Sequence, residues 1–365
     1  MNGKKITVLI MAAGTGGHVF PALAIAQQLK NNSVNVEWLG TPQGMENSLV
    51  PMTDIPLHSV SVKGLRGTGV LRWLSAPFML SIALFQSLKV IRKVKPNCVL
   101  GMGGFICGPA GIATKLLGKP LLIHEQNAVP GLTNKWLSRF SRKVFEAFPN
   151  TFANKVGAIY TGNPLRNEIL SISNPSVSVS KGSGFNLLVI GGSQGSLAIN
   201  KVIPELAVNW SSTASLNIRH QTGSTNLQET LLHYEKLGLQ IGDNIVVEPF
   251  INEMAEAYNW ADMVICRSGA STVSELAAVG LPSILVPYPH HKDQQQLLNA
   301  KWLAESGGAS IIEQKHFSAK AALQILLILS EDRIQLAELG EKVRTLAIPN
   351  ADELISQHCM DVING

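Results

Sequence analysis

Charge is scarce in this sequence, and acidic residues are almost missing from its first half. Charged side chains make up 15% of the 365 residues, compared with about 25% in average soluble proteins, which argues against a disordered chain or a coiled coil. Residues 1–165 carry 17 Lys and Arg but only 5 Asp and Glu, whereas residues 166–365 carry 13 Lys and Arg and 20 Asp and Glu. Residues 55–124 contain no acidic residue. This asymmetry predicts that the first half faces an anionic partner, either nucleic acid or a membrane surface.

Cysteine is also scarce. The four cysteines are Cys98, Cys107, Cys266 and Cys359, and they form no Cys-x-x-Cys pair. Their spacing argues against a disulfide scaffold and a structural zinc site, and it favours a reducing, cytoplasmic environment.

No stretch predicts a membrane-spanning helix. Ile6–Ala13 is apolar but runs directly into a glycine-rich turn, so we expect a buried strand there rather than a signal peptide. Trp73–Leu88 has 16 uncharged residues, fewer than the roughly 20 that span a bilayer, and it contains Pro77.

The stretch around Trp73–Leu88 has a composition typical of a helix that lies in a membrane interface. Basic residues border an apolar, aromatic core, and the patch consists of Trp73, Leu74, Phe78, Ile82, Phe85, Lys89, Arg92 and Lys93. Each basic residue near an anionic leaflet contributes about 1 kcal/mol, so the patch predicts reversible docking. A buried core helix with a basic end is the alternative interpretation. Nucleic acid is disfavoured as a partner, because the aromatic residues do not alternate with basic ones as stacking platforms would.

The chain contains the same α/β unit twice. Apolar strands at Ile6–Met11 and Leu187–Ile190 are each followed by a glycine-rich turn and a helix, and further short apolar runs alternate with helical segments. This alternation predicts two Rossmann-like domains with parallel sheets facing each other across a cleft, and ligands at the carboxyl ends of the strands. The predicted domains are 1–170 and 186–349, joined by a serine-rich linker at 171–185. A last helix at 350–365 is expected to pack back on the first domain.

Three glycine-rich loops predict phosphate binding. They are Gly14–His18, Gly101–Phe105 and Gly191–Gly195, and such loops let backbone N–H groups approach oxygen atoms closely. A dinucleotide oxidoreductase is the competing hypothesis, with Glu37 as the ribose-binding acid. The first loop has Val19 where its fingerprint needs glycine, and no loop ends in Gly-Lys-Ser/Thr as a Walker A loop does.

The segment Cys266–Glu275 is the most specific local feature. Gly269 and Ser271 begin a predicted helix after an apolar strand, where N–H groups can bind a phosphate. Glu275, one turn further on, can accept hydrogen bonds from both hydroxyls of a ribose. Simple N-capping, with Glu275 as a capping-box partner, is the alternative interpretation.

Several motifs together resemble one family. They are Gly14–Pro21, Gly101–Pro109, His124–Asn127, Gly162–Arg166, Gly191–Gly195, Arg267–Glu275 and His291–Gln296. In this order they are similar to the MurG family, the bacterial N-acetylglucosaminyltransferases that make lipid II for peptidoglycan. Ala13 departs from the family pattern, as does an apparent extra residue near His291.

The resemblance implies a GT-B fold, UDP-GlcNAc as donor, and lipid I (undecaprenyl-pyrophosphoryl-MurNAc-pentapeptide) as acceptor. It also implies a peripheral protein at the cytoplasmic face of the inner membrane. The implied donor contacts are Glu275 for ribose and the Ile251 backbone for uracil. Around the diphosphate they are Arg166, Ser193, Ala270, Ser271 and Thr272, and around the sugar they are Gln295, Gln296, Thr15, Gly16, Gly17 and Asn127. Val273 and Ser274 are further implied substrate-binding residues. Gly14, Gly103 and Gly104 are placed to receive the acceptor pyrophosphate. For Arg166, Asn127 and Ser193, a purely structural role is the alternative.

The expected mechanism is a single inverting displacement without a metal. No Asp-x-Asp motif occurs, so we expect neither a metal nor another cofactor, and helix amides with Arg166 must stabilise the leaving diphosphate. His18 is the predicted base, because histidine side chains titrate near neutral pH, and Glu125 is the reserve candidate. A role for His18 in orienting the loop or the acceptor is an open alternative.

Three other functions are weighed against this one. A different UDP-sugar enzyme of the same fold, such as a UDP-GlcNAc 2-epimerase, would need no lipid acceptor. A non-catalytic nucleotide-binding, membrane-associated protein would bind UDP-GlcNAc without releasing UDP. A dehydrogenase would bind a nicotinamide cofactor instead.

Overall fold

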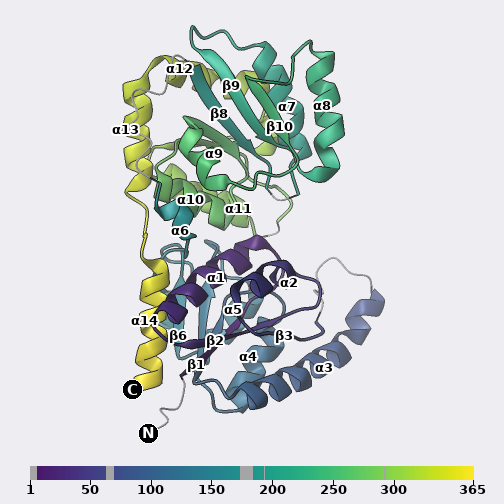
Figure 1. The fold of residues 1–365 in the computed structure, drawn as a ribbon, viewed down its shortest axis with the longest axis vertical. Helices are drawn as coiled ribbons and strands as arrows, with labels where there is room; N and C mark the ends of the chain where they lie inside the picture. The colour runs from purple at the N-terminus through teal and green to yellow at the C-terminus, as the bar shows by residue number, and fades with distance from the viewer. Residues whose placement is uncertain (1–5, 63–69, 173–183, 193, 292) are drawn as a thin grey trace. The chain divides into compact units, whose positions relative to one another are not determined.

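The computed structural model describes residues 6–62, 70–172, 184–192, 194–291 and 293–365 (Figure 1). The chain divides into two compact units. The first unit comprises Met1–Arg166 and Ile348–Gly365, and the second unit comprises Asn167–Ala347. The chain therefore passes from one unit to the other at Arg166, where the sequence predicted a boundary at 170, and returns at Ile348.

The first unit is built on a parallel sheet with the strand order β3-β2-β1-β4-β5-β6-β7 within the described residues. Its strands are β1 (Thr7–Met11), β2 (Asn35–Gly40), β3 (Leu57–Ser59), β4 (Cys98–Gly101), β5 (Leu121–Glu125), β6 (Lys143–Glu146) and β7 (Ile159–Tyr160). In the central pairing Val8 lies opposite both Val36 and Cys98. The central strands read as continuous apolar runs because helices cover both faces of a parallel sheet.

The helices of the first unit follow the strands in alternation. They are α1 (Gly16–Asn31), α2 (Glu46–Leu49), α3 (Val70–Val94), α4 (Cys107–Leu116), α5 (Leu132–Leu137) and α14 (Ala351–Asn364), with short 3-10 turns at Val50–Thr53 and Asn154–Val156. The last helix, α14, packs against α1 and β4, and its Ile355 and Cys359 share a core cluster with Ile25 and Leu29.

The second unit has a parallel sheet with the order β10-β9-β8-β11-β12-β13. Its strands are β8 (Gly184–Ile190), β9 (Ser215–Gln221), β10 (Ile245–Glu248), β11 (Met263–Cys266), β12 (Ser283–Leu285) and β13 (Ala309–Ile311). Its helices are α6 (Asn167–Leu170), α7 (Leu197–Val208), α8 (Leu227–Lys236), α9 (Met254–Trp260), α10 (Ala270–Val279), α11 (Gln295–Ala304), α12 (Ala319–Glu331) and α13 (Arg333–Arg344), with 3-10 turns at Ser224–Asn226 and Gln314–His316. The α/β class with two parallel-sheet, Rossmann-like domains is therefore confirmed.

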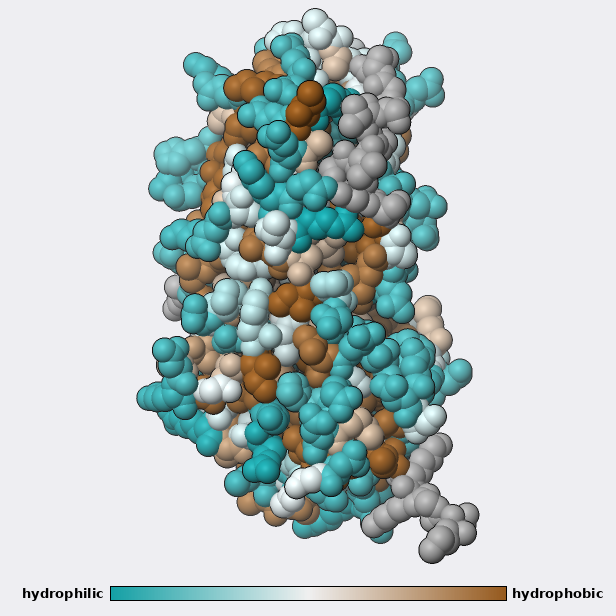
Figure 2. All heavy atoms as spheres, turned by 90° about the vertical axis from the view of Figure 1, so that its left-hand side faces the viewer, coloured by the Kyte–Doolittle hydropathy of each residue, from teal (hydrophilic) through white to brown (hydrophobic). Residues whose placement is uncertain are grey.

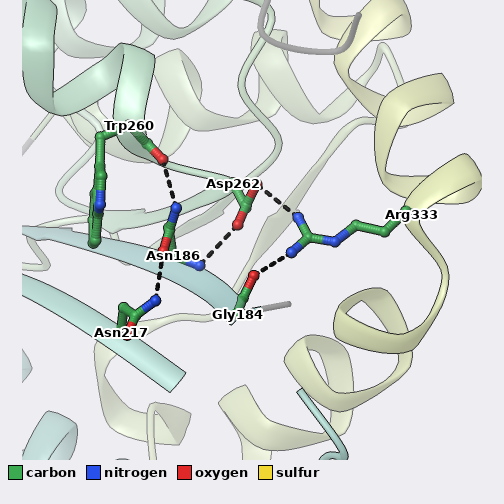
Figure 3. Close-up of polar contacts among 6 residues, drawn as sticks. All are labelled: Gly184, Asn186, Asn217, Trp260, Asp262 and Arg333. Atoms are coloured by element: carbon green, nitrogen blue, oxygen red, sulfur yellow. Dashed lines mark hydrogen bonds and ion pairs between the residues drawn. The ribbon is translucent and has the colours of Figure 1, made fainter. Parts of the chain in front are cut away.

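A charged cluster holds the amino ends of the strands in the second unit (Figure 3). Arg333, at the start of α13, pairs with the buried Asp262 at 2.7 Å and also donates to the carbonyl of Gly184. Asp262 in turn accepts from the N–H of Asn186 at 2.8 Å, and the Asn186 side chain bridges Trp260 and Asn217. The cluster thus joins β8, β9 and the approach to β11 at the sheet edge opposite the glycine-rich loops.

Candidate functional site

The loop after β1 is supported by a buried carboxylate. Glu46 is fully buried, and it accepts from the Gly14 N–H at 3.0 Å and from the N–H and hydroxyl of Thr41 at 2.8 Å. The N–H of Gly14, predicted to contact a pyrophosphate, is therefore occupied. Gly16 and Gly17 form the first turn of α1, after Thr15 as a cap whose side chain makes no capping hydrogen bond. Helix N–H groups at this position have no partner inside the helix.

The loop after β4 packs tightly against the first loop. Gly103 and Gly104 both have positive φ, and a Cβ on Gly103 would collide with the His18 ring while one on Gly104 would collide with the Ala13 carbonyl. These two glycines, predicted to bind pyrophosphate, therefore also allow the two loops to meet at His18.

His18 is hydrogen-bonded to a buried chain of polar groups. Its Nδ1 lies 3.1 Å from Oε1 of Gln126, and the Gln126 amide nitrogen lies 2.8 Å from the Met102 carbonyl and 3.1 Å from Nδ1 of His124. Nε2 of His124 lies 2.9 Å from the Gly162 carbonyl. Burial lowers the pKa of His124 to about 4, so this ring is neutral at pH 7.

Glu125 shapes the loop after β5 and is poorly placed to act as a base. Its two carboxylate oxygens accept four hydrogen bonds, from the backbone and side chain of Asn127, from the Gly131 N–H and from the Asn134 side chain. The side chain is also buried. Asn127, predicted to contact the sugar, is thereby fixed by Glu125.

Arg166 is the last residue of the first unit before the chain enters the second unit. Its guanidinium lies over the ring of Phe20, 4.9 Å from the centroid. This contact fixes the cation beside the first turns of α1.

In the second unit, the loops after β8 and β9 interlock through glycines. A Cβ on Gly195 would collide with the Thr222 carbonyl, and one on Gly223 would collide with the Gln194 carbonyl. Both glycines have positive φ. Ser193, predicted to contact the diphosphate, lies outside the described residues.

Gln221 joins the glycine loop to the segment predicted to bind uracil. Its amide nitrogen donates to the Gly192 carbonyl at 2.9 Å, and its oxygen accepts from the Ile251 N–H at 3.0 Å. The Ile251 N–H is thus occupied, so a backbone contact from Ile251 to a base must use its carbonyl.

The start of α10 presents polar groups without a side-chain cap. Gly269 is the cap residue and cannot shield the first N–H groups of Ala270, Ser271 and Thr272. The buried hydroxyl oxygen of Ser271 has no hydrogen-bond partner among the described residues. Buried polar atoms are ordinarily paired, and a helix N-terminus favours an anion, so this end of α10 fits a phosphate group. Val273 is buried against the core.

Glu275 is oriented by a buried tyrosine. The Tyr258 hydroxyl, from α9, donates to Oε2 of Glu275 at 2.9 Å, and Tyr258 is 1% exposed. This bond fixes the carboxylate one turn after the start of α10, where the sequence predicts ribose binding.

Gln295 and Gln296 begin α11, and Gln296 also stabilises the preceding loop. Oε1 of Gln296 accepts from the Tyr288 N–H at 2.9 Å, and its carbonyl accepts from the Ser268 hydroxyl at 2.7 Å. The loop after β12 is further held by Arg267, which donates to the Val286 carbonyl at 2.9 Å. Burial lowers the pKa of the Arg267 guanidinium.

No cluster of three or more metal-ligating side chains occurs among the described residues. His290 and His291 instead lie edge-on to the Tyr288 ring.

The described part of α3 has an exposed apolar face. Phe78 and Phe85 are each 71% exposed, whereas Ala83 and Ile91 face the core and α3 packs against α4. Ile82, Lys89, Arg92 and Lys93 are also exposed, and the side chains of Trp73 and Leu74 lie outside the described residues. Within the described chain, no helix is both long and apolar enough to cross a bilayer. Figure 2 shows a different face of the chain, which is largely hydrophilic with apolar residues scattered over it.

Three residues that position the site were missed by the sequence analysis. Gln126, Gln221 and Tyr258 act on groups far away in the chain, such as His18, 108 residues from Gln126. Only Gln126 had a local signal, since it lies inside the motif His124–Asn127.

Both units match models of one glycosyltransferase family. Residues 8–146 match the glycosyltransferase family 28 N-terminal domain, and residues 186–355 match the glycosyltransferase family 28 C-terminal domain. These matches, with the similar structures below, confirm the predicted GT-B class.

Curated relatives are similar over almost the whole chain. A UDP-N-acetylglucosamine–N-acetylmuramyl-(pentapeptide) pyrophosphoryl-undecaprenol N-acetylglucosamine transferase from Haemophilus ducreyi is 46% identical and covers 98% of this chain and 99% of the relative. The crystal structure of Acinetobacter baumannii MurG is 40% identical with a TM-score of 0.81, and the match covers 98% of this chain and 99% of the MurG chain. A UDP-GlcNAc 2-epimerase from Neisseria meningitidis shares the fold alone. Its structure is 13% identical with a TM-score of 0.68, and the match covers 98% of this chain and 100% of the epimerase chain.

Proposed function

The chain belongs to glycosyltransferase family 28 and to its MurG family, and from this premise we propose that it transfers N-acetylglucosamine from UDP-GlcNAc to lipid I. The products are lipid II, with a β-1,4 linkage to the C4 hydroxyl of MurNAc, and UDP. The observation that carries this proposal is 44–46% identity to transferases of that name over 96–99% of the chain.

The second unit binds the donor in this proposal. The first N–H groups of α10 receive the diphosphate together with the Ser271 hydroxyl, which has no partner among the described residues. Glu275, held by Tyr258, receives the ribose hydroxyls. The Ile251 carbonyl receives the uracil N–H, since its own N–H is bound to Gln221. Gln295 and Gln296, at the start of α11, receive the sugar hydroxyls.

The first unit receives the acceptor. Gly16 and Gly17 at the start of α1 offer N–H groups to the lipid pyrophosphate. Arg166, whose guanidinium lies over Phe20, supplies a positive charge to the leaving diphosphate. The basic composition of this half supports an anionic acceptor.

The reaction is a single inverting displacement. His18 accepts the proton of the MurNAc C4 hydroxyl as the oxygen bonds to C1 of GlcNAc, and the bond from C1 to UDP breaks with its electron pair going to the diphosphate. The amides of α10 stabilise this leaving charge, which is where electrostatic catalysis gains most. The proposal requires neither a metal nor another cofactor.

The test is UDP release from UDP-GlcNAc, measured with and without a lipid I analogue. Release that depends on the analogue and yields the disaccharide lipid supports the transfer. Acceptor-independent conversion of UDP-GlcNAc would identify an epimerase. Donor binding without release would identify a nucleotide-binding protein, and either result contradicts the proposal.

We further propose that α3 docks the chain on an anionic membrane, peripherally and at the cytoplasmic face of the inner membrane, and that nucleic acid is not a partner. The exposed Phe78 and Phe85 would enter the interface, while Lys89 and Arg92 contact lipid phosphates.

Vesicle sedimentation tests this docking. We expect the double variant Phe78→Ser and Phe85→Ser to bind phosphatidylglycerol vesicles at least roughly tenfold more weakly. The matched control is Leu232→Ser on α8, which is 52% exposed and should bind like the wild type. Equal binding by all three proteins would contradict docking through α3.

A further inference from the structure

The buried polar chain in the first unit fixes the position of one proton on His124. Nε2 of His124 lies 2.9 Å from the Gly162 carbonyl, which can only accept, so Nε2 carries the hydrogen. Because burial lowers the pKa of this ring to about 4, the ring is neutral at pH 7. Its Nδ1 can then only accept a hydrogen bond.

The orientation of the Gln126 amide follows from its two neighbours. One end of the amide lies 2.8 Å from the Met102 carbonyl and 3.1 Å from Nδ1 of His124. Both neighbours are acceptors, so this end must be the NH₂ group. The amide oxygen therefore faces His18. Gln126 is 1% exposed. Bulk water therefore cannot replace these hydrogen-bond partners of its amide.

The amide oxygen of Gln126 determines which nitrogen of His18 carries the proton. Oε1 lies 3.1 Å from Nδ1 of His18 and can only accept, so Nδ1 carries the hydrogen. In the neutral ring the lone pair is then on Nε2, which no group in the described chain contacts by a hydrogen bond. Gly103 packs against the ring, where a Cβ would collide with Nδ1, so the ring is also held sterically.

We propose that Gln126 is a positioning residue that fixes His18 as the Nδ1–H tautomer and thereby makes Nε2 the atom that accepts the proton. The inference rests on the proposed function for its catalytic meaning. During transfer, the C4 hydroxyl proton moves to Nε2, the hydroxyl oxygen bonds to C1 of GlcNAc, and the electron pair of the broken bond leaves with UDP. In the serine hydrolases a buried carboxylate holds the catalytic histidine in its tautomer. Here a neutral amide, itself oriented by His124 and Met102, has that task.

The tautomer can be read directly by ¹⁵N NMR of the full chain labelled at its histidines. The His18 signals are identified as those lost in His18→Gln. At a pH where the ring is neutral, we expect a protonated Nδ1 and an unprotonated Nε2. In Gln126→Met, which keeps the side-chain length without the amide, we expect a shift toward the Nε2–H form that free imidazole side chains prefer.

Turnover provides the second readout. We expect kcat of Gln126→Met to fall roughly tenfold or more, because the base is then protonated on the wrong nitrogen. The KM for UDP-GlcNAc should change by less than about threefold, since the donor contacts lie elsewhere.

The matched control is Asn163→Ala. Asn163 donates to the backbone carbonyl of Gln126 at 3.0 Å, so this change loosens the loop but leaves the side-chain amide in place. We expect the tautomer of His18 to be retained. Loss of the tautomer in this control would mean that general loosening, not the amide, accounts for the effect.

The proposal is overturned by a wild-type spectrum with His18 in the Nε2–H form, whether or not any variant folds. It is also overturned if Gln126→Met loses the tautomer but keeps its kcat. Failure of the proposed function looks different: the wild type would release no UDP with lipid I, while the spectra would still report the tautomer.

Discussion

The two units share an architecture but use the carboxyl edge of the sheet differently. In the first unit, the glycine loops meet at the titratable side chain of His18, which is supported by Gln126 and His124. In the second unit, the corresponding loops present backbone amides at α10 and one oriented carboxylate, Glu275. The charged Arg333–Asp262 cluster of the second unit lies at the opposite sheet edge (Figure 3). Under the proposed function, this difference assigns proton transfer to one copy of the fold and donor binding to the other.

The charge balance follows the same division. The first unit, with residues 348–365 included, has 18 Lys and Arg against 8 Asp and Glu. The second unit has 12 Lys and Arg against 17 Asp and Glu. An acidic unit cannot attract an anionic nucleotide by its net charge, so the donor binding proposed for it would depend on directed hydrogen bonds.

The largest expected effect separates chemistry from binding. His18→Gln should lower kcat by about 10²–10⁴-fold, the usual contribution of a general base, with little change in the KM for UDP-GlcNAc. Steady-state kinetics with a lipid I analogue measure both constants. The control is His316→Gln, an exposed histidine of the second unit, which should behave as the wild type. Near-normal turnover of His18→Gln would show that His18 is not the base. The first unit would then have no assigned role in proton transfer.

The next effect concerns the stability of the second unit. Arg333→Leu leaves the buried Asp262 carboxylate without its cation and should cost about 3 kcal/mol in the free energy of unfolding. Chemical denaturation of the full chain measures it. Lys315→Ala removes the exposed pair with Glu313 and should change the stability by less than about 0.5 kcal/mol. UDP binding by folded Arg333→Leu should persist, and its loss would show that the two sheet edges are not independent.

Acid should destabilise both units through one buried histidine each. Burial lowers the pKa of His124 to about 4 and that of His220 to about 3, against an ordinary value near 6.5. The unfolded chain therefore binds more protons below pH 6.5, so stability falls as the pH drops from 6.5 toward 4 and flattens below the folded pKa.

At pH 5 each histidine should account for a loss of roughly 2 kcal/mol relative to pH 7. Denaturation midpoints at both pH values measure it. His220→Asn should lose stability at pH 7 but show a smaller further loss at pH 5. An unchanged pH dependence would mean that His220 is not the titrating group.

The smallest effect tests the binding unit. Tyr258→Phe removes one hydrogen bond to the Glu275 carboxylate, and we expect a loss of about 1 kcal/mol, or roughly fivefold in affinity for UDP. Calorimetric titration with UDP measures it, and kcat at saturating UDP-GlcNAc should stay the same. A fall in kcat with unchanged affinity would place Tyr258 in the chemistry instead.

Local patterns in the sequence predict the elements well. The apolar strand expected just before Gly269 is β11 (Met263–Cys266), and the last helix, Ala351–Asn364, lies within the predicted range 350–365. The first helix, predicted to follow the glycine-rich loop Gly14–His18, begins inside that loop at Gly16. Glycines have low helix propensity, so the first turn of α1 carries no local signal and is stabilised by its tertiary setting.

The candidate site is predictable only in part. Loops and helix starts place Ser271 and Glu275 correctly at the carboxyl edge, because parallel strands all end there. The sequence does not reveal that Glu46 occupies the Gly14 N–H or that Glu125 is saturated by hydrogen bonds. Such pairings form between residues far apart in the chain, and a polar residue gives no local sign of its distant partner.

The return of α14 to the first unit has a consequence for biosynthesis. A nascent chain that has not yet reached residue 348 lacks the helix whose Ile355 and Cys359 pack against Ile25 and Leu29. Domains made first on the ribosome usually complete their folding first. Here the second unit has all its residues before the first unit does, so we expect the second unit to complete its core first.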